Sequence, residues 1–395
     1  MLSVCVLNPS SELGGAERSL LDLLRRLSGK DMRYMRFTVL LPRNGPLEGK
    51  LRELDVDSLI VPMPASILGL SRKNLAGSAA GAFLSAPAFI AYLAGLIWTV
   101  RRLKCSVIYT NGIKSHITGA LISRFCGCRL VWHVRDIVKE GLFLRLLRLA
   151  STRADRIIFN SNFTARSFKN VLSATDKVVY NGFDLSYFAG YGGDPGEFRK
   201  KYGISGDALL CGTLGVLTRG KGLEVLVAAA PLLINEHKNI RFIIAGDDIY
   251  DTPEGEGCRA RLEALVEDKG LSPYFVFTGF LEDIRPCLAS LDIFVMPSVA
   301  VESFGRSAVE AMLSKKPVVA SGIGALPELI EDGVTGFLVK PSSPDELASA
   351  IDKLLRDKEL RDNIATLGFH RALDSFPVDK YAFSVEKVLS GAGSS

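Results

Sequence analysis

Several features that often define a protein class are missing from this 395-residue sequence. The seven cysteines are odd in number and scattered, and the one close pair, Cys126-Gly-Cys128, has no second pair to complete a zinc site. We therefore expect free, buried thiols in a reducing compartment. The first dozen residues lack a basic leader and a long apolar core, so no signal peptide is expected.

Acidic residues are absent from Ser58 to Arg135, a stretch of 78 residues. Residues 1–187 carry 26 Lys/Arg and 13 Asp/Glu, a net charge of +13, whereas residues 188–395 carry 22 and 30, a net charge of −8. The overall charge of +5 therefore hides a basic half joined to an acidic half. A basic half predicts an anionic partner: a nucleic acid, an acidic substrate or a membrane surface.

Short, continuous apolar runs rich in β-branched residues alternate with longer helical patterns along the whole chain. The predicted strands are Ser3–Leu7, Phe37–Leu41, Ser58–Val61, Val107–Tyr109, Leu130–His133, Arg156–Phe159, Lys177–Tyr180, Leu209–Leu214, Ile240–Ala245, Phe275–Thr278, Ile293–Met296, Val318–Ala320 and Gly336–Val339. Because these runs do not alternate apolar with polar residues, both faces of each strand are expected to be buried by helices. The pattern predicts an α/β fold of two Rossmann-like domains, each a doubly wound parallel sheet, facing a ligand-binding cleft.

A stretch rich in glycine, proline and small residues, near Asp184–Lys201, marks the break between the two predicted domains. We expect a first domain of residues 1–187 and a second of residues 188–374. A last helix, about residues 375–392, is expected to pack back on the first domain. The chain is 48% hydrophobic and long enough for two cores.

Two glycines, Gly14 and Gly15, follow the first predicted strand and precede a helix expected to begin near Ala16. They would let a phosphate approach backbone N–H groups at the positive end of that helix, although an ordinary tight turn has the same sequence. No dinucleotide fingerprint is complete, because the nearest match, GIGALP at 322–327, has proline where the third glycine is needed.

Two glutamates, Glu302 and Glu310, follow the predicted strand Ile293–Met296 and a Pro-Ser loop. Gly305 lies between them at the start of a predicted helix, where N–H donors and the helix dipole would face an anion. A carboxylate accepts strong hydrogen bonds from hydroxyl groups such as those of a sugar or a ribose. From charge placement alone, the alternative that both acids are solvated residues at a helix end stays open.

The stretch PSVAVESFGRSAVEAM (297–312), with KKPVVAS (315–321) and LPELIEDGVTGFLV (326–339), resembles the C-terminal domain of retaining GT-B glycosyltransferases of the group 1, or family 4, type. The signature of that family is two glutamates with seven residues between them. Weaker matches in the family's order extend the resemblance over most of the chain: GGAE (14–17), His133, VVYNGFD (178–184), GTLGVLTRGKG (212–222), AGD (245–247) and FTGFLEDI (277–284).

The resemblance implies a role for each matching residue. Glu302 would face the donor sugar as a catalytic residue, with His133, while Glu310 would hold the nucleotide ribose. Lys221 would neutralise the diphosphate leaving group. Further donor-binding residues implied by the resemblance, in part through their backbone N–H groups, are Gly14, Gly15, Ser303, Phe304, Gly305 and Arg306. The family implies neither a metal nor a cofactor, because the nucleotide sugar is the donor substrate.

One position departs from the family. An arginine usually follows the glycine at position 215, and this chain has Val216 there. Arg219 is the nearby cation that could replace it and would then bind the donor; otherwise it is a surface residue without a role. Asn181-Gly182, just before the break, is expected to shape an interdomain turn.

A 26-residue run without a formal charge, Leu75–Val100, raises the question of a membrane span. Pro87 and many small residues make it only moderately apolar, and predicted strands on both sides of it must pair in one sheet. We therefore expect either buried helices or an apolar surface that rests on lipid.

A second segment, Gly141–Ala150, places Arg145 and Arg148 beside Phe143 and several leucines, as an interfacial helix does. The surrounding residues 72–156 carry a net charge of +11. An anionic membrane surface is therefore the expected partner of this region. Nucleic acid is not expected, because no recognition motif or interleaved aromatic platform is present.

Together these features predict a cytoplasmic, metal-independent, retaining glycosyltransferase (a hexosyltransferase) peripheral to the inner face of the membrane. It would move a sugar from a nucleotide diphosphate sugar to a glycan or lipid-linked acceptor, in cell-envelope or surface polysaccharide synthesis. Two other classes stay open: a sugar-nucleotide epimerase of the same fold, and a non-catalytic membrane-associated sugar-nucleotide-binding protein, suggested by Val216. A lipid-facing basic surface argues against the first, and the retained Glu302, Glu310, Lys221 and His133 argue against the second.

Overall fold

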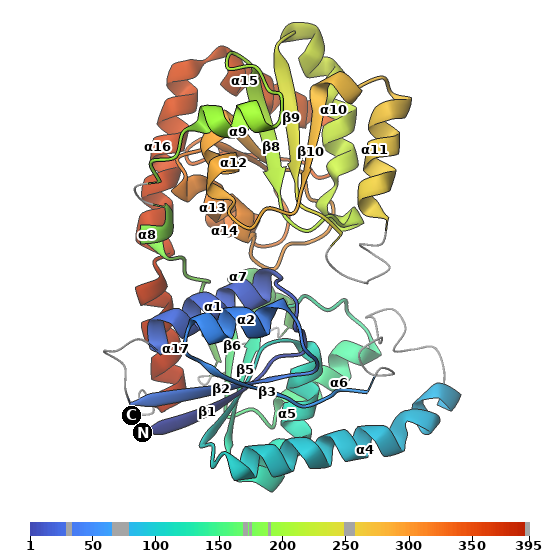
Figure 1. The fold of residues 1–395 in the computed structure, drawn as a ribbon, viewed down its shortest axis with the longest axis vertical. Helices are drawn as coiled ribbons and strands as arrows, with labels where there is room; N and C mark the ends of the chain where they lie inside the picture. The colour runs from blue at the N-terminus through green and yellow to red at the C-terminus, as the bar shows by residue number, and fades with distance from the viewer. Residues whose placement is uncertain are drawn as a thin grey trace. The chain divides into compact units, whose positions relative to one another are not determined.

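The computed structural model describes residues 1–28, 34–64, 79–168, 173, 176–188, 191–248 and 257–391, with the backbone alone for 79–86. The chain divides into two compact units (Figure 1). The first unit is Met1–Gly182 together with Val378–Ser395, and the second is Phe183–Pro377. Each unit contains one fully parallel sheet, which confirms the predicted α/β fold of two Rossmann-like domains.

The first unit is built on a seven-stranded sheet with the order β3-β2-β1-β4-β5-β6-β7. Its strands are β1 (Leu2–Leu7), β2 (Met35–Leu41), β3 (Asp57–Ile60), β4 (Val107–Thr110), β5 (Arg129–Val134), β6 (Arg156–Phe159) and β7 (Asp176–Val178). Its helices are α1 (Gly15–Leu27), α2 (Pro46–Glu53), α4 (Ala79–Arg102), α5 (Ile113–Cys126), α6 (Leu142–Ser151), α7 (Asn162–Phe168) and α17 (Val378–Ser390). Each predicted strand of this half is present, with ends that differ by at most two residues.

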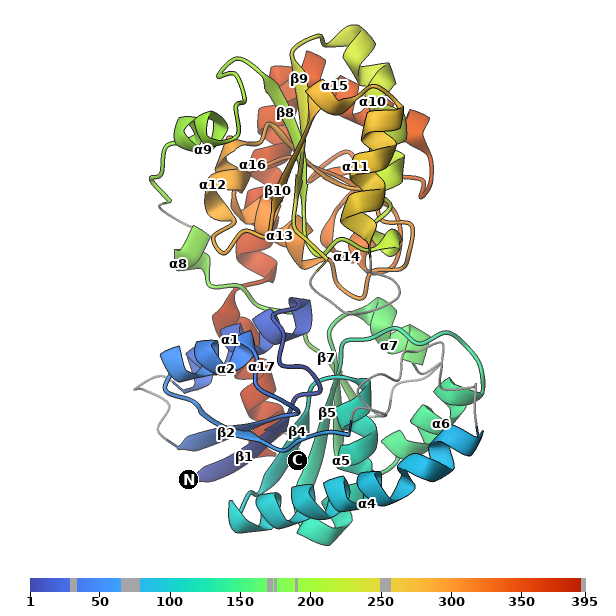
Figure 2. The same ribbon diagram turned by 45° about the vertical axis from the view of Figure 1, so that its right-hand side comes forward.

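Side chains from both faces of this sheet are buried, which explains the continuous apolar runs in the sequence. Val4 and Val6 of β1 pack in a core with side chains of α1, α2 and α17. The alternate residues Cys5 and Leu7 pack in a second core with side chains of α4, α5, α6 and α7. The sheet is thus covered by helices on both sides (Figures 1 and 2).

The second unit is built on a six-stranded sheet with the order β10-β9-β8-β11-β12-β13. Its strands are β8 (Leu209–Leu214), β9 (Ile240–Ala245), β10 (Phe275–Gly279), β11 (Ile293–Met296), β12 (Val318–Ser321) and β13 (Phe337–Val339). Its helices are α8 (Leu185–Phe188), α9 (Pro195–Lys201), α10 (Leu223–Glu236), α11 (Cys258–Asp268), α12 (Arg285–Ser290), α13 (Arg306–Leu313), α14 (Leu326–Leu329), α15 (Pro344–Arg356) and α16 (Lys358–Ser375). Short 3-10 turns lie at Arg219–Lys221 and Ser272–Tyr274.

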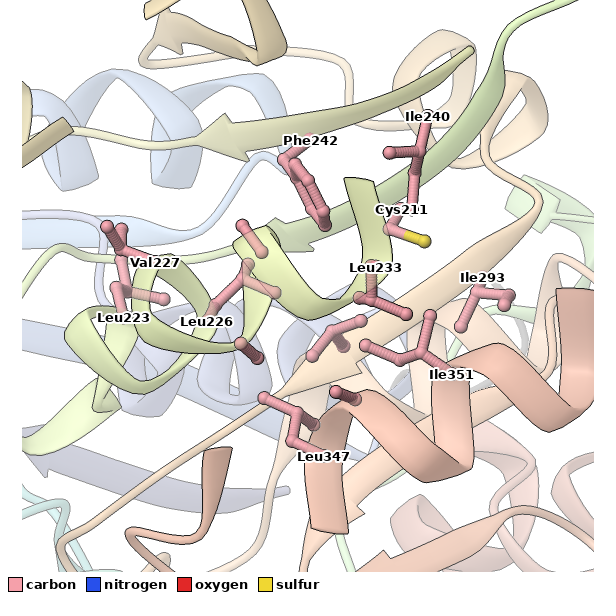
Figure 3. Close-up of a cluster of buried hydrophobic side chains, with 14 of the residues drawn as sticks. Cys211, Leu223, Leu226, Val227, Leu233, Ile240, Phe242, Ile293, Leu347 and Ile351 are labelled. Carbon is pink, nitrogen blue, oxygen red and sulfur yellow. The ribbon is translucent and has the colours of Figure 1, made fainter. Parts of the chain in front are cut away.

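One core of the second unit lies between its sheet and the helices α10, α11 and α15 (Figure 3). Leu226 of α10 and Ile351 of α15 are fully buried there, beside Phe242 of β9 and Ile293 of β11. A fully buried leucine, isoleucine or phenylalanine side chain stabilises the folded state by roughly 1.5–3 kcal/mol. This core therefore fixes the strands whose carboxyl ends carry the loops described below.

All seven cysteines are free thiols, and five of them are buried, while Cys126 and Cys128 are half-buried. The expectation of free thiols is therefore confirmed. Across the described parts of the chain, we find no helix with the length and apolar character needed to cross a membrane. The apolar run 75–100 lies partly outside the described residues, and the remainder forms most of α4.

Candidate functional site

Loops that follow β8, β11 and β12 come together at the carboxyl edge of the second unit's sheet. The N–H groups of Val299 and Ala300, after β11, donate to the carbonyl of Gly220, after β8, at 2.9 and 3.0 Å. The N–H of Ala325, after β12, donates to the carbonyl of Glu302 at 2.9 Å. Because parallel strands deliver their carboxyl ends to one edge, residues distant in sequence become neighbours there.

Glu302 binds side chains from two of these loops. Its Oε1 accepts a hydrogen bond from Lys221 Nζ at 2.8 Å and another from Ser298 Oγ at 2.7 Å. Lys221 and Glu302 are 81 residues apart in sequence, and their side chains are 29% and 17% exposed. The structure thus joins the two charged residues for which the family resemblance implies contacts to the diphosphate and the donor sugar, and leaves both partly open to solvent.

Glu310 lies in the second turn of α13 and has a different cationic partner. Its Oε1 accepts from Arg306 Nη2 at 3.2 Å, and both side chains are largely buried. The Arg306 guanidinium also lies over the ring of Phe183, 4.4 Å from the ring centroid. Phe304 is buried and stacks on the same Phe183 ring, so its side chain anchors the loop in the core. The backbone of Phe304, and not its side chain, is therefore the part that can contact a ligand.

The N-terminus of α13 has the geometry of an anion site. Gly305, the residue before the helix, has φ of 104°, and no side chain caps the helix there. A Cβ at this position would lie 2.5 Å from Leu326 Cδ2. Glycine is therefore needed for the backbone angle, and its lack of a side chain leaves room for the Leu326 side chain of α14. A helix N-terminus without a side-chain cap favours binding of a negatively charged group.

Gly324 is expected to be indispensable for the shape of this site. Its φ is +67°, and a Cβ there would lie 2.3 Å from the carbonyl oxygen of Glu302 and 2.5 Å from the Glu302 nitrogen. We expect Gly324→Ala to lower the free energy of unfolding by about 1–3 kcal/mol and to weaken donor binding, because Glu302 must shift. Gly322→Ala is the matched control: its Cβ would meet only atoms 3.7 Å away or more. Equal unfolding midpoints and donor affinities for the two variants would contradict this account.

Arg219 is exposed, whereas Val216 is half-buried. Within the described residues, the Arg219 side chain makes no hydrogen bond or ion pair. Backbone hydrogen bonds hold the start of the loop that follows β8. Gly215 N–H donates to the Ala245 carbonyl at 3.0 Å, and Leu217 N–H donates to the Asp247 carbonyl at 3.1 Å. Lys221 is therefore the cation of this loop that is held in place, and the replacement of the missing arginine by Arg219 stays a prediction.

Among the residues that the structure describes, no group of three or more His, Cys, Asp or Glu side chains is placed to hold a metal ion. An Asp-x-Asp triplet of the kind found in metal-dependent glycosyltransferases does occur, at Asp55-Val-Asp57. It lies at the start of β3, where Asp57 Oδ2 accepts from Arg36 Nη2 at 2.8 Å. Independence from metal stays a prediction.

The two predicted glycines of the first unit lie at the start of α1. Gly14 is buried and extended, with φ of −88° and ψ of −175°, and Gly15 is the exposed first residue of the helix. No side chain caps this N-terminus. The arrangement suits a phosphate at the carboxyl end of β1, and its use in donor binding stays a prediction.

The predicted interfacial segment forms α6. Arg145 is exposed and Phe143 is half-buried. The Arg148 guanidinium is already bonded, because Nη2 donates to Glu140 Oε1 at 2.7 Å and Nε donates to the Phe168 carbonyl. Of the two arginines proposed for the membrane, only Arg145 is therefore without a bonded protein partner in the described structure.

His133 lies in a buried polar network at the carboxyl edge of the first unit's sheet. Its Nδ1 contacts the hydroxyl of Tyr109 and lies 3.3 Å from Arg135 Nη2, which also donates to the Tyr381 hydroxyl at 2.6 Å. A guanidinium can only donate, so Nδ1 must accept and the neutral ring carries its proton on Nε2. Nε2 itself is buried and has no hydrogen-bond partner among the described residues. His133 is thus arranged as an N–H donor and not as a base.

Several members of this network were not singled out in the sequence. Arg135 Nε donates to Asn111 Oδ1 at 2.7 Å, and Asn111 Nδ2 donates to Asn8 Oδ1 at 2.8 Å. Asn8 in turn contacts the buried Glu17, its Nδ2 being 3.4 Å from Oε1. Asn8, Asn111 and Arg135 each directly follow a strand, and that position could have identified them from the sequence.

Asn181-Gly182 lies at the boundary between the two units, and the Asn181 side chain has a further role that the sequence did not indicate. It is buried, and its Oδ1 accepts from Arg135 Nη1 within the first unit. The helix α17 contributes Tyr381 to the same network. Neither contact could be read from the local sequence, because Asn181 is 46 residues and Tyr381 246 residues from Arg135.

The buried histidines predict a pH-dependent stability. Burial lowers the pKa of His116 to about 3 and that of His133 well below 6.5, and the nearby Arg135 charge lowers both further. Below pH 6.5 the unfolded chain gains protons that the folded chain does not. The free energy of unfolding should therefore fall with decreasing pH, by about 1.4 kcal/mol per pH unit for each histidine. Burial raises the pKa of Glu17, which offsets part of this fall nearer pH 5.

Urea unfolding at pH 7, 6 and 5 measures this dependence. Both tryptophans, Trp98 and Trp132, lie in the first unit, so tryptophan fluorescence follows the unit that holds the histidines. His116→Gln should remove one histidine's share of the slope. An unchanged slope in that variant would show that His116 is not kept neutral by burial.

Two family models match the chain, one to each unit. The model described as Glycosyltransferase Family 4 matches residues 13–187, and the model described as Glycosyl transferases group 1 matches residues 194–370. Together they span most of the chain. The chain therefore belongs to the group 1 glycosyltransferases of GT-B fold.

The match to each of two curated relatives covers only part of that relative's length. An uncharacterized glycosyltransferase of Methanocaldococcus jannaschii is 34% identical over 268 residues, which is 66% of this chain and 59% of the relative. The 2-deoxystreptamine glucosyltransferase of Streptomyces kanamyceticus is 31% identical over 228 residues, which is 56% of this chain and 57% of the relative. The chain thus spans less than two thirds of the length of the curated relatives it matches.

Solved structures match over the whole chain. Anabaena HepE in complex with UDP-glucose is 26% identical, with a TM-score of 0.84, and the match covers 99% of this chain and 100% of that one. Sucrose-phosphate synthase from Thermosynechococcus elongatus is 19% identical, with a TM-score of 0.79 and 99% of both chains covered, which shows likeness of fold alone.

Proposed function

We propose that this protein transfers a sugar from a nucleotide diphosphate sugar to an acceptor hydroxyl, with retention of anomeric configuration and without a metal ion. The observation that carries the proposal is the contact between Lys221 and Glu302, which places a cation and a carboxylate beside the N-terminus of α13. Such a site offers positive charge for a leaving diphosphate and a carboxylate for sugar hydroxyls. Membership of the group 1 family supports the same reaction.

Each side chain then has a defined task. Glu310, held by Arg306, accepts hydrogen bonds from the two ribose hydroxyls. As the anomeric C–O bond breaks, negative charge grows on the diphosphate, and Lys221 and the backbone N–H groups from Ser303 to Arg306 stabilise it. Glu302 faces the anomeric carbon, where positive charge develops. His133 is proposed as a donor of a hydrogen bond from Nε2–H to the sugar.

The acceptor hydroxyl attacks the anomeric carbon from the face that the diphosphate leaves. One diphosphate oxygen takes the acceptor proton, so the nucleotide diphosphate departs with the proton and the new glycosidic bond keeps the donor's configuration. Binding to Glu310 holds the donor in place while this occurs.

We propose a uridine diphosphate hexose as the donor. The support is the similarity to HepE, whose crystal structures contain UDP and UDP-glucose and which matches this chain over its full length at 26% identity. The second unit, which holds Lys221, Glu302 and Glu310, is proposed to bind this donor, and the first unit to bind the acceptor.

We propose further that the acceptor is a glycan or a lipid-linked sugar, and that the protein works peripherally at the cytoplasmic face of the membrane in surface polysaccharide synthesis. The net charge of +11 over residues 72–156 and the exposed leucines of α6 support a membrane location. An anionic surface would attract this region at low ionic strength.

A thermal-shift panel of nucleotide sugars, followed by turnover assays, tests the proposal. We expect UDP-hexoses to raise Tm more than the corresponding GDP and ADP sugars, and donor turnover to persist in a metal chelator. The anomeric proton signal of the product, read by NMR, should match the configuration of the donor. Strong inhibition by the chelator or an inverted product would overturn the mechanism. An epimerised donor would identify an epimerase, and binding without any turnover would identify a binding protein.

A further inference from the structure

Three helices of the first unit, α4, α5 and α6, lie side by side on one face of its sheet (Figure 2). Their inward side chains, including Leu96, Ile122 and Leu144, are buried in the core beneath them. Because α5 packs against both α4 and α6, the outward side chains of the three helices form one surface, here called the outer helical face.

Large apolar side chains are exposed on the outer helical face. Trp98 of α4 is 62% exposed and Phe125 of α5 is 61% exposed, and both line a groove of about 650 Å³ between the two helices. On α6, Leu142, Leu146 and Leu149 are 74%, 54% and 67% exposed. A concentration of exposed apolar side chains on one surface marks an interaction site.

The charged side chains of these helices are all basic. None of α4, α5 and α6 contains an aspartate or a glutamate. The Arg102 guanidinium lies over the Trp98 ring, 5.0 Å from its centroid, so an aromatic ring and a cation are presented together. Arg124 and Arg145 are exposed and have no bonded partner among the described residues.

We propose that the outer helical face docks on a bilayer containing anionic lipid. Leucine and aromatic side chains enter the boundary between headgroups and acyl chains, while arginines reach lipid phosphates, which is the pattern of an interfacial helix. Nucleic acid would leave the exposed leucines without a role. A second copy of the chain would bring two basic faces together and repel.

This inference deepens the proposed membrane location and does not depend on sugar transfer. It also changes which arginines are proposed to contact lipid. Arg148 is not among them, because it is held by Glu140 and the Phe168 carbonyl. Arg102, Arg124 and Arg145 take its place as contacts to lipid phosphate. Arg101 donates to the Phe125 carbonyl at 2.9 Å through Nε and helps to fix α4 on α5.

The tryptophans make the docking directly measurable in the full-length protein. Trp132 is fully buried, so the exposed Trp98 supplies any change in fluorescence on adding vesicles. We expect a blue shift, and quenching by brominated acyl chains, with vesicles of phosphatidylglycerol and phosphatidylcholine at low salt. Phosphatidylcholine alone should give neither signal. Trp98→Phe should abolish the shift while the protein still sediments with anionic vesicles.

Charge reversal tests the arginines by co-sedimentation. Arg124→Glu combined with Arg145→Glu should weaken binding to anionic vesicles at least tenfold. Lys238→Glu with Lys269→Glu makes the same change in net charge at exposed positions of the second unit, and should leave binding near wild type. Far-UV circular dichroism and Tm show that each variant is folded.

Three results would overturn the inference: wild-type protein that stays in the supernatant with anionic vesicles at low salt, equal losses in the two charge-reversal variants, or a Trp98 shift caused by self-association without lipid. Donor turnover in detergent is measured separately. Lipid binding without turnover would leave the docking face intact and overturn the proposed transferase, whereas turnover without lipid binding would do the reverse.

Discussion

Replacing Lys221 with alanine should reduce the rate of donor turnover by a factor of between some tens and about a thousand. The ammonium lies 2.8 Å from Glu302 at the candidate site. In the proposed mechanism it stabilises the negative charge that grows on the leaving diphosphate. A charge-assisted contact of this kind stabilises the transition state by roughly 2–4 kcal/mol. Rates at saturating and subsaturating UDP-hexose measure the loss.

Folding should be affected far less than catalysis by this substitution. The Lys221 and Glu302 side chains are 29% and 17% exposed, and a partly exposed ion pair contributes at most about 1 kcal/mol to stability. Arg219→Ala is the control within the same loop: weakened donor affinity there would show that Arg219 replaces the arginine missing at Val216. Wild-type turnover in Lys221→Ala would remove Lys221 from the site.

The two glutamates should separate kinetically when each is changed to glutamine. Glu310→Gln is expected to raise KM for the donor with little change in kcat, because ribose binding is shared by the ground and transition states. Glu302→Gln is expected to lower kcat by at least about tenfold, because it removes a negative charge beside the carbon where positive charge develops. Initial rates over a range of donor concentrations distinguish the two.

The hydrogen bonds around each carboxylate sharpen this comparison. Glutamine at position 302 keeps an oxygen for Lys221 and Ser298, and glutamine at 310 keeps one for Arg306, so both loops should retain their shape. A reversed pattern, with KM affected at 302 and kcat at 310, would show that the assigned roles are exchanged although the site is right.

The sequence was sufficient to predict the strands and the folding class. Residues such as Val4, Cys5, Val6 and Leu7 are all apolar because helices bury both faces of β1, and that cause acts locally enough to be read as a run. The motif around Glu302 and Glu310 was equally readable, because the spacing places one acid in the loop and the other on the second turn of α13.

The buried network around His133 could not be predicted in the same way. Its members come from the ends of several strands and from α17, and Arg135 bonds Tyr381 across 246 residues of sequence. The protonated nitrogen of His133 follows from that contact geometry and from no local pattern. Asn181, expected only to shape an interdomain turn, is also a buried acceptor for Arg135.

By itself, then, the sequence determined the order of strands and helices, the family resemblance and the basic character of the first half, because periodicity, motif spacing and charge are properties of neighbouring residues. Only the tertiary structure decided which charges are paired. Lys221 meets Glu302 because β8 and β11 end at the same edge of a sheet. Arg145 and Arg148 lie three residues apart, on the same side of α6, yet Arg148 is held by Glu140 and the Phe168 carbonyl while Arg145 is exposed, because only the fold determines which groups each side chain meets.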